Sequence, residues 1–184
     1  WANVYDGPAG RHDAGTAIAV DGSGNVIVAG FSNDSANRSD YIVIKYAPNG
    51  DTVWTRRYNG PGDQQDYVAG LALDDAGNSY VTGLSYVDQN HYNYATIKYS
   101  PDGGECWVAR YAGPRGTDQA SAIALDAEDN IYVTGASLSA SVSWDVVTIK
   151  YDSAGSQRWI EHYDRPTAGK RVAAWVTAMD EPLG

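Results

Sequence analysis

The chain repeats itself with a period of about 53 residues, and this repeat constrains the fold more than any other feature of the sequence. Successive tryptophans stand 53, 53 and 52 residues apart, and other residue types keep the same step. The recurring positions are Trp1, Trp54, Trp107 and Trp159; Tyr5, Tyr58, Tyr111 and Tyr163; Asp21, Asp74 and Asp126; Gly30, Gly83 and Gly135; Lys45, Lys98 and Lys150; and Gly50, Gly103 and Gly155. A fixed period in this range is typical of solenoids, propellers and arrays.

Each repeat contains four short runs that read as β-strands. In the second repeat these runs cover residues 68–73, 79–83, 94–99 and 106–111, and Gly, Pro, Asn or Asp residues bound each of them. No apolar pattern with helical spacing lasts ten residues. Four strands joined by short turns and repeated radially make a propeller blade. The sequence therefore predicts an all-β propeller of four-stranded blades.

The number of repeats predicts an incomplete ring. The chain supplies a fourth-strand segment at residues 1–5, three complete sets of four strands, and a drifting first-strand-like segment at residues 172–180. We interpret residues 1–184 as a single propeller domain or a fragment of one, with repeat units 1–53, 54–106, 107–158 and a partial unit 159–184. Since propellers have about four to eight blades, about three and a half blades do not close a ring. The missing blades come from further chain or from another subunit, or the ring stays open with exposed edges. A start in the middle of a repeat favours a processed product or a piece of a longer polypeptide.

The order of the strands assigns the loops to two faces of the propeller. In the first repeat we expect strands at 17–21, 25–30, 41–46 and 53–58. Because loops of an antiparallel meander alternate between its ends, the turns after the first and third strands share one face. The other loops share the opposite face; they are 7–13, 60–66 and 113–118 before the first strands, and 33–39, 86–92 and 138–144 after the second strands. The last three loops vary most between repeats, and variable loops on a regular scaffold are a common place for binding.

Aromatic and polar side chains in two of these variable loops form the candidate ligand site. Its residues are Tyr86, Asp88, Asn90, His91, Tyr92 and Trp144. Exposed rings stack on apolar faces, and carboxylates and amides bind hydroxyl groups, so this set would suit a sugar or a peptide. The alternative is that these side chains fold back onto the blade.

A second candidate site is a ring of carboxylates. Asp13, Asp66 and Asp118 recur just before the first strand of each repeat, at the mouth of any central channel. Calcium takes several oxygen ligands, so three converging carboxylates could bind it. The alternative is that each aspartate accepts hydrogen bonds from backbone N–H groups in its own loop or in the next blade. No other cofactor is expected.

Several repeated residues have structural roles in this interpretation. Gly24 and Gly77 stand where a tight hairpin needs a positive φ, and Asp129 replaces them in the third repeat. Lys45, Lys98 and Lys150 are expected to pair with the repeated acidic residues, and the repeated Trp and Tyr to pack between neighbouring blades. The three histidines, which include His12 and His162, show no spacing typical of a zinc site.

The composition narrows the classes of function. The chain has 13 Lys and Arg against 23 Asp and Glu, a net charge of −10. Because nucleic acids and anionic membranes need a basic surface, neither is an expected partner. No apolar run approaches the ~20 residues that span a bilayer. The single cysteine, Cys106, cannot form an internal disulfide, and the chain lacks a Gly-x-Ser-x-Gly nucleophile elbow.

The third repeat carries a family resemblance. It reads Asp-Ala-Glu-Asp-Asn-Ile-Tyr-Val-Thr-Gly-Ala-Ser over residues 126–137, then Asp-Val-Val-Thr-Ile-Lys-Tyr over 145–151, then Gly155-x-x-x-Trp159. These strings resemble the SBBP β-propeller repeat of bacterial secreted and cell-surface proteins, a relative of the NHL-type blade. The resemblance implies a propeller fold and an extracellular or periplasmic location, and it brings no catalytic residues. The Gly-x-x-x-Trp spacing is also similar to the tryptophan-docking motif of quinoprotein alcohol dehydrogenases, a blade-packing device that implies no quinone cofactor.

These observations favour a non-enzymatic binding or scaffolding module that presents its variable-face loops to a glycan or a protein. Two alternatives stay open. The chain could be the propeller portion of a larger enzyme, such as a lyase, a glycosidase or a quinoprotein, or it could be a structural repeat of a surface assembly. Association of identical chains, or further chain, would complete the ring.

Overall fold

The computed structural model describes residues 1–88, 91–141 and 143–164, and the described residues form twelve strands and no helix. The strands are β1 (Asp13–Val20), β2 (Val26–Asn33), β3 (Ser39–Tyr46), β4 (Thr52–Tyr58), β5 (Asp66–Leu73), β6 (Ser79–Asp88), β7 (His91–Tyr99), β8 (Glu105–Tyr111), β9 (Asp118–Leu125), β10 (Ile131–Leu138), β11 (Trp144–Tyr151) and β12 (Gln157–Tyr163). Among the described residues there is accordingly no helix that could cross a bilayer.

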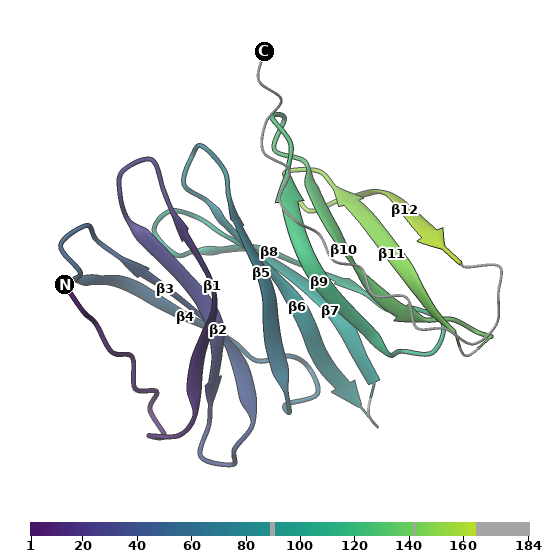
Figure 1. The fold of residues 1–184 in the computed structure, drawn as a ribbon, viewed down its shortest axis with the longest axis horizontal. Coiled ribbons are helices and arrows are strands. Elements are labelled where there is room, and N and C mark those ends of the chain that lie inside the picture. The colour runs from purple at the N-terminus through teal and green to yellow at the C-terminus, as the bar shows by residue number, and fades with distance from the viewer. Residues whose placement is uncertain (89–90, 142, 165–184) are drawn as a thin grey trace.

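The strands form three four-stranded antiparallel sheets, each in chain order. We call β1–β4 blade 1, β5–β8 blade 2 and β9–β12 blade 3. Figure 1 shows the three blades fanned side by side, and the first strands β1, β5 and β9 contact one another in turn. The predicted all-β propeller with four-stranded blades is confirmed, and the described blades form an open arc rather than a closed ring.

The turns follow the predicted conformations. Gly24 and Gly77 have φ of 81° and 82°, and Asp129 has φ of 57° at the same place in blade 3. Asp is one of the few residues with a side chain that enters this left-handed region readily, so the third hairpin keeps its shape without glycine.

The hydrophobic core lies between the blades. We call the face of a blade toward the preceding blade its front face, and the face toward the following blade its back face. The back face of blade 1 packs on the front face of blade 2 through Ile27, Ala29, Tyr41, Val43 and Trp54 against Val68, Val81, Ala95, Ile97 and Tyr99. The back face of blade 2 meets blade 3 in the same way, with Tyr80 and Tyr94 against Val133, Val147 and Ile149. The predicted packing of repeated aromatics between blades is confirmed.

Trp54 and Trp107 each dock on a turn of the next blade. Trp54 Nε1 donates a hydrogen bond to the Pro101 carbonyl at 3.0 Å, and Trp107 Nε1 donates to the Ser153 carbonyl at 3.2 Å. The ring of Trp54 lies over Gly103, whose φ is +84°, and a Cβ built there would stand 2.9 Å from the ring. Only glycine suits this position, which explains why Gly and Trp recur together.

Three sequence expectations need correction or fall outside the description. Residues 1–5 form no strand, since none of the described sheets includes a strand that pairs with them. The expected loop 86–92 is mostly strand, since β6 runs to Asp88 and β7 begins at His91. The expected first-strand-like segment 172–180 lies outside the described residues.

Candidate functional site

Each of the three repeated aspartates closes its own loop. Asp66 Oδ2 accepts a hydrogen bond from Gly60 N at 2.6 Å, and its Oδ1 accepts one from Tyr86 N at 3.1 Å. Asp118 accepts from Gly113 N at 2.6 Å, and Asp13 accepts from Gly7 N at 2.8 Å. These are the local backbone bonds that sequence reasoning gave as the alternative to calcium binding.

The surroundings of these carboxylates do not resemble a metal centre. Burial raises the pKa of Asp66 and of Asp118, against the opposing effect of hydrogen bonds from Ser85 and Ser137. Within residues 1–88, 91–141 and 143–164, no three His, Cys, Asp or Glu side chains come together as a metal site would need. The structure therefore does not bring Asp13, Asp66 and Asp118 together.

We expect Asp66→Ala to lower the free energy of unfolding by about 1–3 kcal/mol, because the buried Gly60 N–H group loses its acceptor and the Tyr86 N–H group keeps only the Gln65 carbonyl. Urea unfolding with and without Ca²⁺ measures this loss. The loss should be the same in both conditions. A wild-type stabilisation by Ca²⁺ that disappears in the variant would restore the calcium hypothesis.

The hairpin between β6 and β7 carries most of the predicted ligand residues. Tyr86 stands opposite Tyr92, and Asp88 stands opposite His91. The two tyrosine rings meet edge to face with centroids 5.4 Å apart. At the exposed end of the hairpin, His91 Nδ1 lies 2.8 Å from Asp88 Oδ1. We call Tyr86, Asp88, His91 and Tyr92 the loop-face patch.

Neighbouring loops hold the hairpin from both sides. On the side of its own blade, Tyr86 N donates to the Gln65 carbonyl at 3.1 Å and Gly62 N donates to the Tyr86 carbonyl at 3.3 Å. On the side of blade 3, Tyr92 N donates to the Gly116 carbonyl at 2.7 Å. Two adjacent loops thus fix the orientation of the loop-face patch.

The lack of a side chain at Gly116 leaves room for the His91 ring. The φ of Gly116 is +61°, and a Cβ built on it would stand 3.1 Å from Cγ of His91. Sequence reasoning missed this residue. The signal was available, since Gly10, Asp63 and Gly116 recur three residues after a Gly-Pro glycine and all have positive φ.

Trp144 lies across the same loop from the patch. Trp144 stands opposite Leu138, and Leu138 N donates to the Thr117 carbonyl at 3.0 Å. Since Tyr92 binds Gly116 and Leu138 binds Thr117, the Tyr86–Tyr92 pair and the Leu138–Trp144 pair flank one short segment. The sixth predicted residue, Asn90, lies outside the described residues.

Blade 1 ends differently at the same place in the repeat. Asn33 and Ser39 replace the tyrosine pair and are buried, with Ser39 Oγ donating to Asn33 Oδ1 at 2.7 Å. Arg38 closes that loop by pairing with Asp34 and with Asp63 of the next loop. Most polar side chains of this loop therefore bond to one another or to the next loop. At the same repeat position, blade 1 presents internally bonded polar residues, whereas blades 2 and 3 present aromatic residues.

Comparison with known proteins supports the repeat assignment. Residues 53–89 and 107–140 match the model of the SBBP family, described as a β-propeller repeat. An uncharacterized WD repeat-containing protein of Acanthamoeba polyphaga mimivirus is 23% identical over 207 residues, and the match covers 85% of this chain but 15% of that protein. Among solved structures, a fucose lectin from Kordia zhangzhouensis in complex with methyl-fucoside is similar at a TM-score of 0.48 with 13% identity, over 80% of this chain and 98% of the lectin.

Proposed function

We propose that this chain, which carries SBBP β-propeller repeats, is a non-enzymatic binding module whose loop-face patch contacts a neutral carbohydrate. The observation that carries the proposal is the edge-to-face tyrosine pair beside an exposed Asp88–His91 pair. A half-buried ring offers an apolar platform with a hydroxyl at its rim, which is the surface on which a sugar ring can stack.

The polar half of the patch suits hydroxyl groups. The side chains of Asp88 and His91 are 64% and 47% exposed, so a ligand can reach both of them. The carboxylate accepts hydrogen bonds, and the imidazole donates or accepts according to its tautomer. With a carboxylate in the patch and a net charge of −10 on the chain, an uncharged sugar fits better than an acidic one.

The geometry favours binding over catalysis. Asp66 and Asp88, two of the carboxylates at the loop face of blade 2, have separate surroundings, since Asp66 accepts backbone hydrogen bonds while Asp88 pairs with His91. An extracellular or periplasmic location belongs to the same proposal, because it is where the resembling repeat proteins act.

We expect Tyr92→Ala to weaken sugar binding about tenfold, a loss of about 1.4 kcal/mol, because it removes one wall of the platform. The backbone bond from Tyr92 to Gly116 survives this change, so the hairpin stays in place. Saturation-transfer NMR with galactose, mannose, N-acetylglucosamine and cellobiose measures binding.

Tyr163→Ala is the matched control, since Tyr163 is an exposed tyrosine at the end of β12, the outer strand of blade 3, whereas the patch lies on β6 and β7 of blade 2. Its sugar affinity should equal that of the wild type. Equal losses in both variants, or binding that survives Tyr92→Ala, would rule out the loop-face patch. Binding of a protein but of none of the sugars would replace the carbohydrate by a protein partner.

A further inference from the structure

The two ends of the arc expose the two halves of an interface that the chain builds twice inside itself. The front face of blade 1 and the back face of blade 3 are not covered by another described blade. We propose that these two faces bind each other between two copies of this chain, head to tail.

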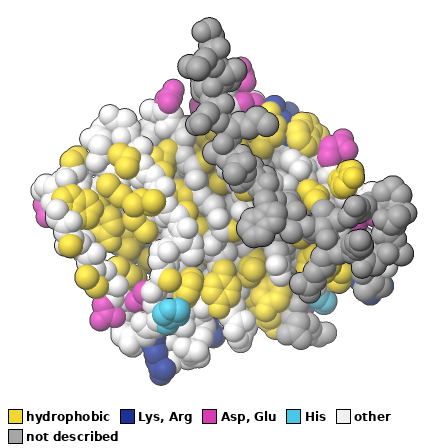
Figure 2. Space-filling view, in the orientation of Figure 1, with side chains coloured by type: hydrophobic (Ala, Val, Ile, Leu, Met, Phe, Trp, Pro, Cys, Tyr) yellow, Lys and Arg dark blue, Asp and Glu magenta, His cyan; other side chains and the backbone are white. Residues whose placement is uncertain are grey.

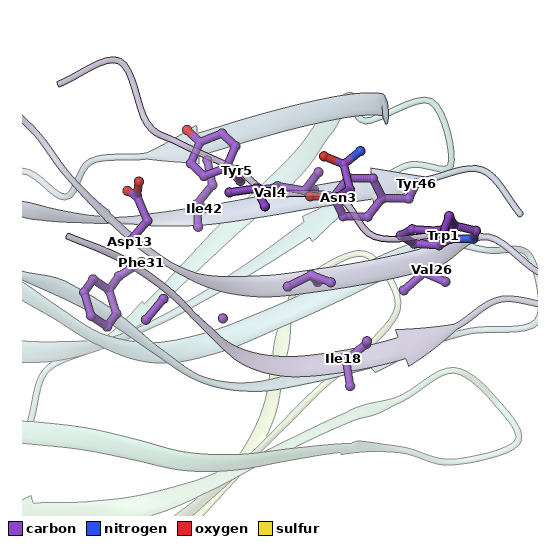
Figure 3. Close-up of a pocket in the computed structure, with 14 residues that line it drawn as sticks. Trp1, Asn3, Val4, Tyr5, Asp13, Ile18, Val26, Phe31, Ile42 and Tyr46 are labelled. Carbon is purple, nitrogen blue, oxygen red and sulfur yellow. The ribbon is translucent and has the colours of Figure 1, made fainter. Parts of the chain in front are cut away.

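The front face of blade 1 presents an apolar groove of about 420 Å³ (Figure 3). Its floor includes Ile18, Val26, Val28, Ile42 and Ile44, and Figure 2 shows apolar side chains gathered over this end of the arc. Ile18 is 70% exposed, whereas its counterparts Leu71 and Ile123 are half-buried beneath the preceding blade. The groove is therefore the kind of face that is covered by a preceding blade in blades 2 and 3 but is not covered by one in blade 1.

The back face of blade 3 is the complementary half. A shallow hollow of about 230 Å³ lies among Ala122, Tyr132, Thr134 and Thr148. Trp159 is 38% exposed on this face, whereas its counterpart Trp54 is only 7% exposed. The residues on the back face of blade 3 hold the same repeat positions as the back-face residues of blades 1 and 2, which cover the front faces of blades 2 and 3.

The internal interfaces show how the halves would meet. A Cβ built on Gly70, on the back face of blade 2, would stand 3.1 Å from Cγ2 of Ile123 on the front face of blade 3. By repeat position, Ala122 of one copy then meets Ile18 of the other. Ala17 holds this repeat position on the back face of blade 1 and Leu71 holds the facing position on blade 2, so the internal interface between blades 1 and 2 already places a methyl group here.

The hydrogen-bond donors and acceptors of the two end faces also correspond to those of the internal interfaces. Trp54 Nε1 and Lys45 Nζ both donate to the Pro101 carbonyl, at 3.0 and 3.4 Å, and Trp107 and Lys98 both donate to the Ser153 carbonyl. Trp159 and Lys150 hold these positions on blade 3. The counterpart of Pro101 on blade 1 is Pro48.

The first residues of the chain already occupy that docking position. Trp1 Nε1 donates to the Pro48 carbonyl at 2.9 Å, and Asn3 Nδ2 donates to the Gly50 carbonyl at 2.9 Å. Trp54 and Arg56 make the same two contacts with blade 2. Trp1 therefore competes with Trp159 of the second copy. It is the weaker competitor, because Trp1 is 65% and Val4 87% exposed and the segment has no strand partner.

Two copies that use this contact twice form a closed six-bladed ring. Six blades fall within the usual range of four to eight, and closure removes the exposed end faces. The contact is heterologous, since the two faces differ, and a heterologous contact that closes gives a discrete ring.

Light scattering on a sizing column tests the proposal with the 184-residue chain. We expect a mass of twice 19.7 kDa for the wild type, and monomers for Ile18→Glu and for Ala122→Glu. Because each variant keeps one good face, an equimolar mixture of the two should regain one junction and form a heterodimer. Val53→Glu is the control, since Val53 is exposed and its counterpart Cys106 stays exposed even in an internal interface.

Trp1→Ala tests the competition. It should strengthen association about tenfold, since it removes the intramolecular competitor for Pro48. A monomeric wild type together with a monomeric Trp1→Ala variant would overturn the proposal. A dimer that persists in Ile18→Glu, or a mixture of the two variants that stays monomeric, would overturn it as well.

Discussion

Trp54→Ala is expected to lower the free energy of unfolding by about 3–5 kcal/mol, the usual loss for a buried tryptophan. The indole is 7% exposed, lies over Gly103 and donates to the Pro101 carbonyl. Its removal leaves a cavity between blades 1 and 2 and deprives that carbonyl of a donor. Urea unfolding followed by circular dichroism measures the loss.

Trp159→Ala is the matched control, because the residue and its place in the repeat are the same. Trp159 is 38% exposed and contacts Tyr132 at a centroid distance of 5.9 Å. Measured in the Ala122→Glu background, where the end face is blocked, Trp159→Ala should cost less than half of the Trp54→Ala loss. Equal losses would mean that the indole stabilises its own blade rather than the junction with the next one.

The fold could be predicted because the residues that build it are repeated. A Trp four residues after a Gly recurs in every unit, and the structure shows the physical reason, since the ring of one blade lies over the glycine of the next. Asp129 could be placed in a hairpin turn because Gly24 and Gly77 precede it in register. Because the repeats can be aligned with one another, the conformation of one turn could be predicted from the residues at the same position in the other repeats.

The candidate site was harder to predict because it consists of what does not repeat. The Tyr86–Tyr92 pair lies within strands rather than in a loop, since two tyrosines facing each other extend the β6–β7 ladder. Strand or loop could not be decided from polar residues alone. The contact of Gly116 with His91 joins two blades, and no local pattern around residue 91 indicates it.

The segment 1–5 shows a different limit. Its Trp and Tyr fit the fourth-strand pattern, and Trp1 docks on blade 1 as predicted from that pattern. A strand, however, also needs a neighbouring strand with which to form hydrogen bonds. The similarity of residues 1–5 to the fourth-strand pattern predicts side-chain contacts, but it does not show whether such a neighbour is present. Side-chain docking therefore persists where the strand does not form.

Lys45→Met is expected to lower the free energy of unfolding by about 3 kcal/mol, because it leaves the Asp21 carboxylate buried without its cation. Lys45 Nζ lies 2.9 Å from Asp21 Oδ2, and the side chains are 7% and 6% exposed. Lys150→Met is the matched control. Its ion pair with Asp126 is 3.5 Å long and the side chains are 21% and 26% exposed, so we expect a loss below about 1 kcal/mol.

The pH dependence separates this ion pair from simple packing. Burial acts to raise the pKa of Asp21, but hydrogen bonds from Asn25 and Lys45 prevail and lower it from 3.8 to about 2. A lowered carboxyl pKa stabilises the fold above pH 3.8, and this contribution is lost as the pH falls toward about 2. The difference between wild type and Lys45→Met should therefore be full at neutral pH and shrink across that acid window. A difference that stays constant down to about pH 2 would assign the loss to the aliphatic stem of Lys45 rather than to its charge.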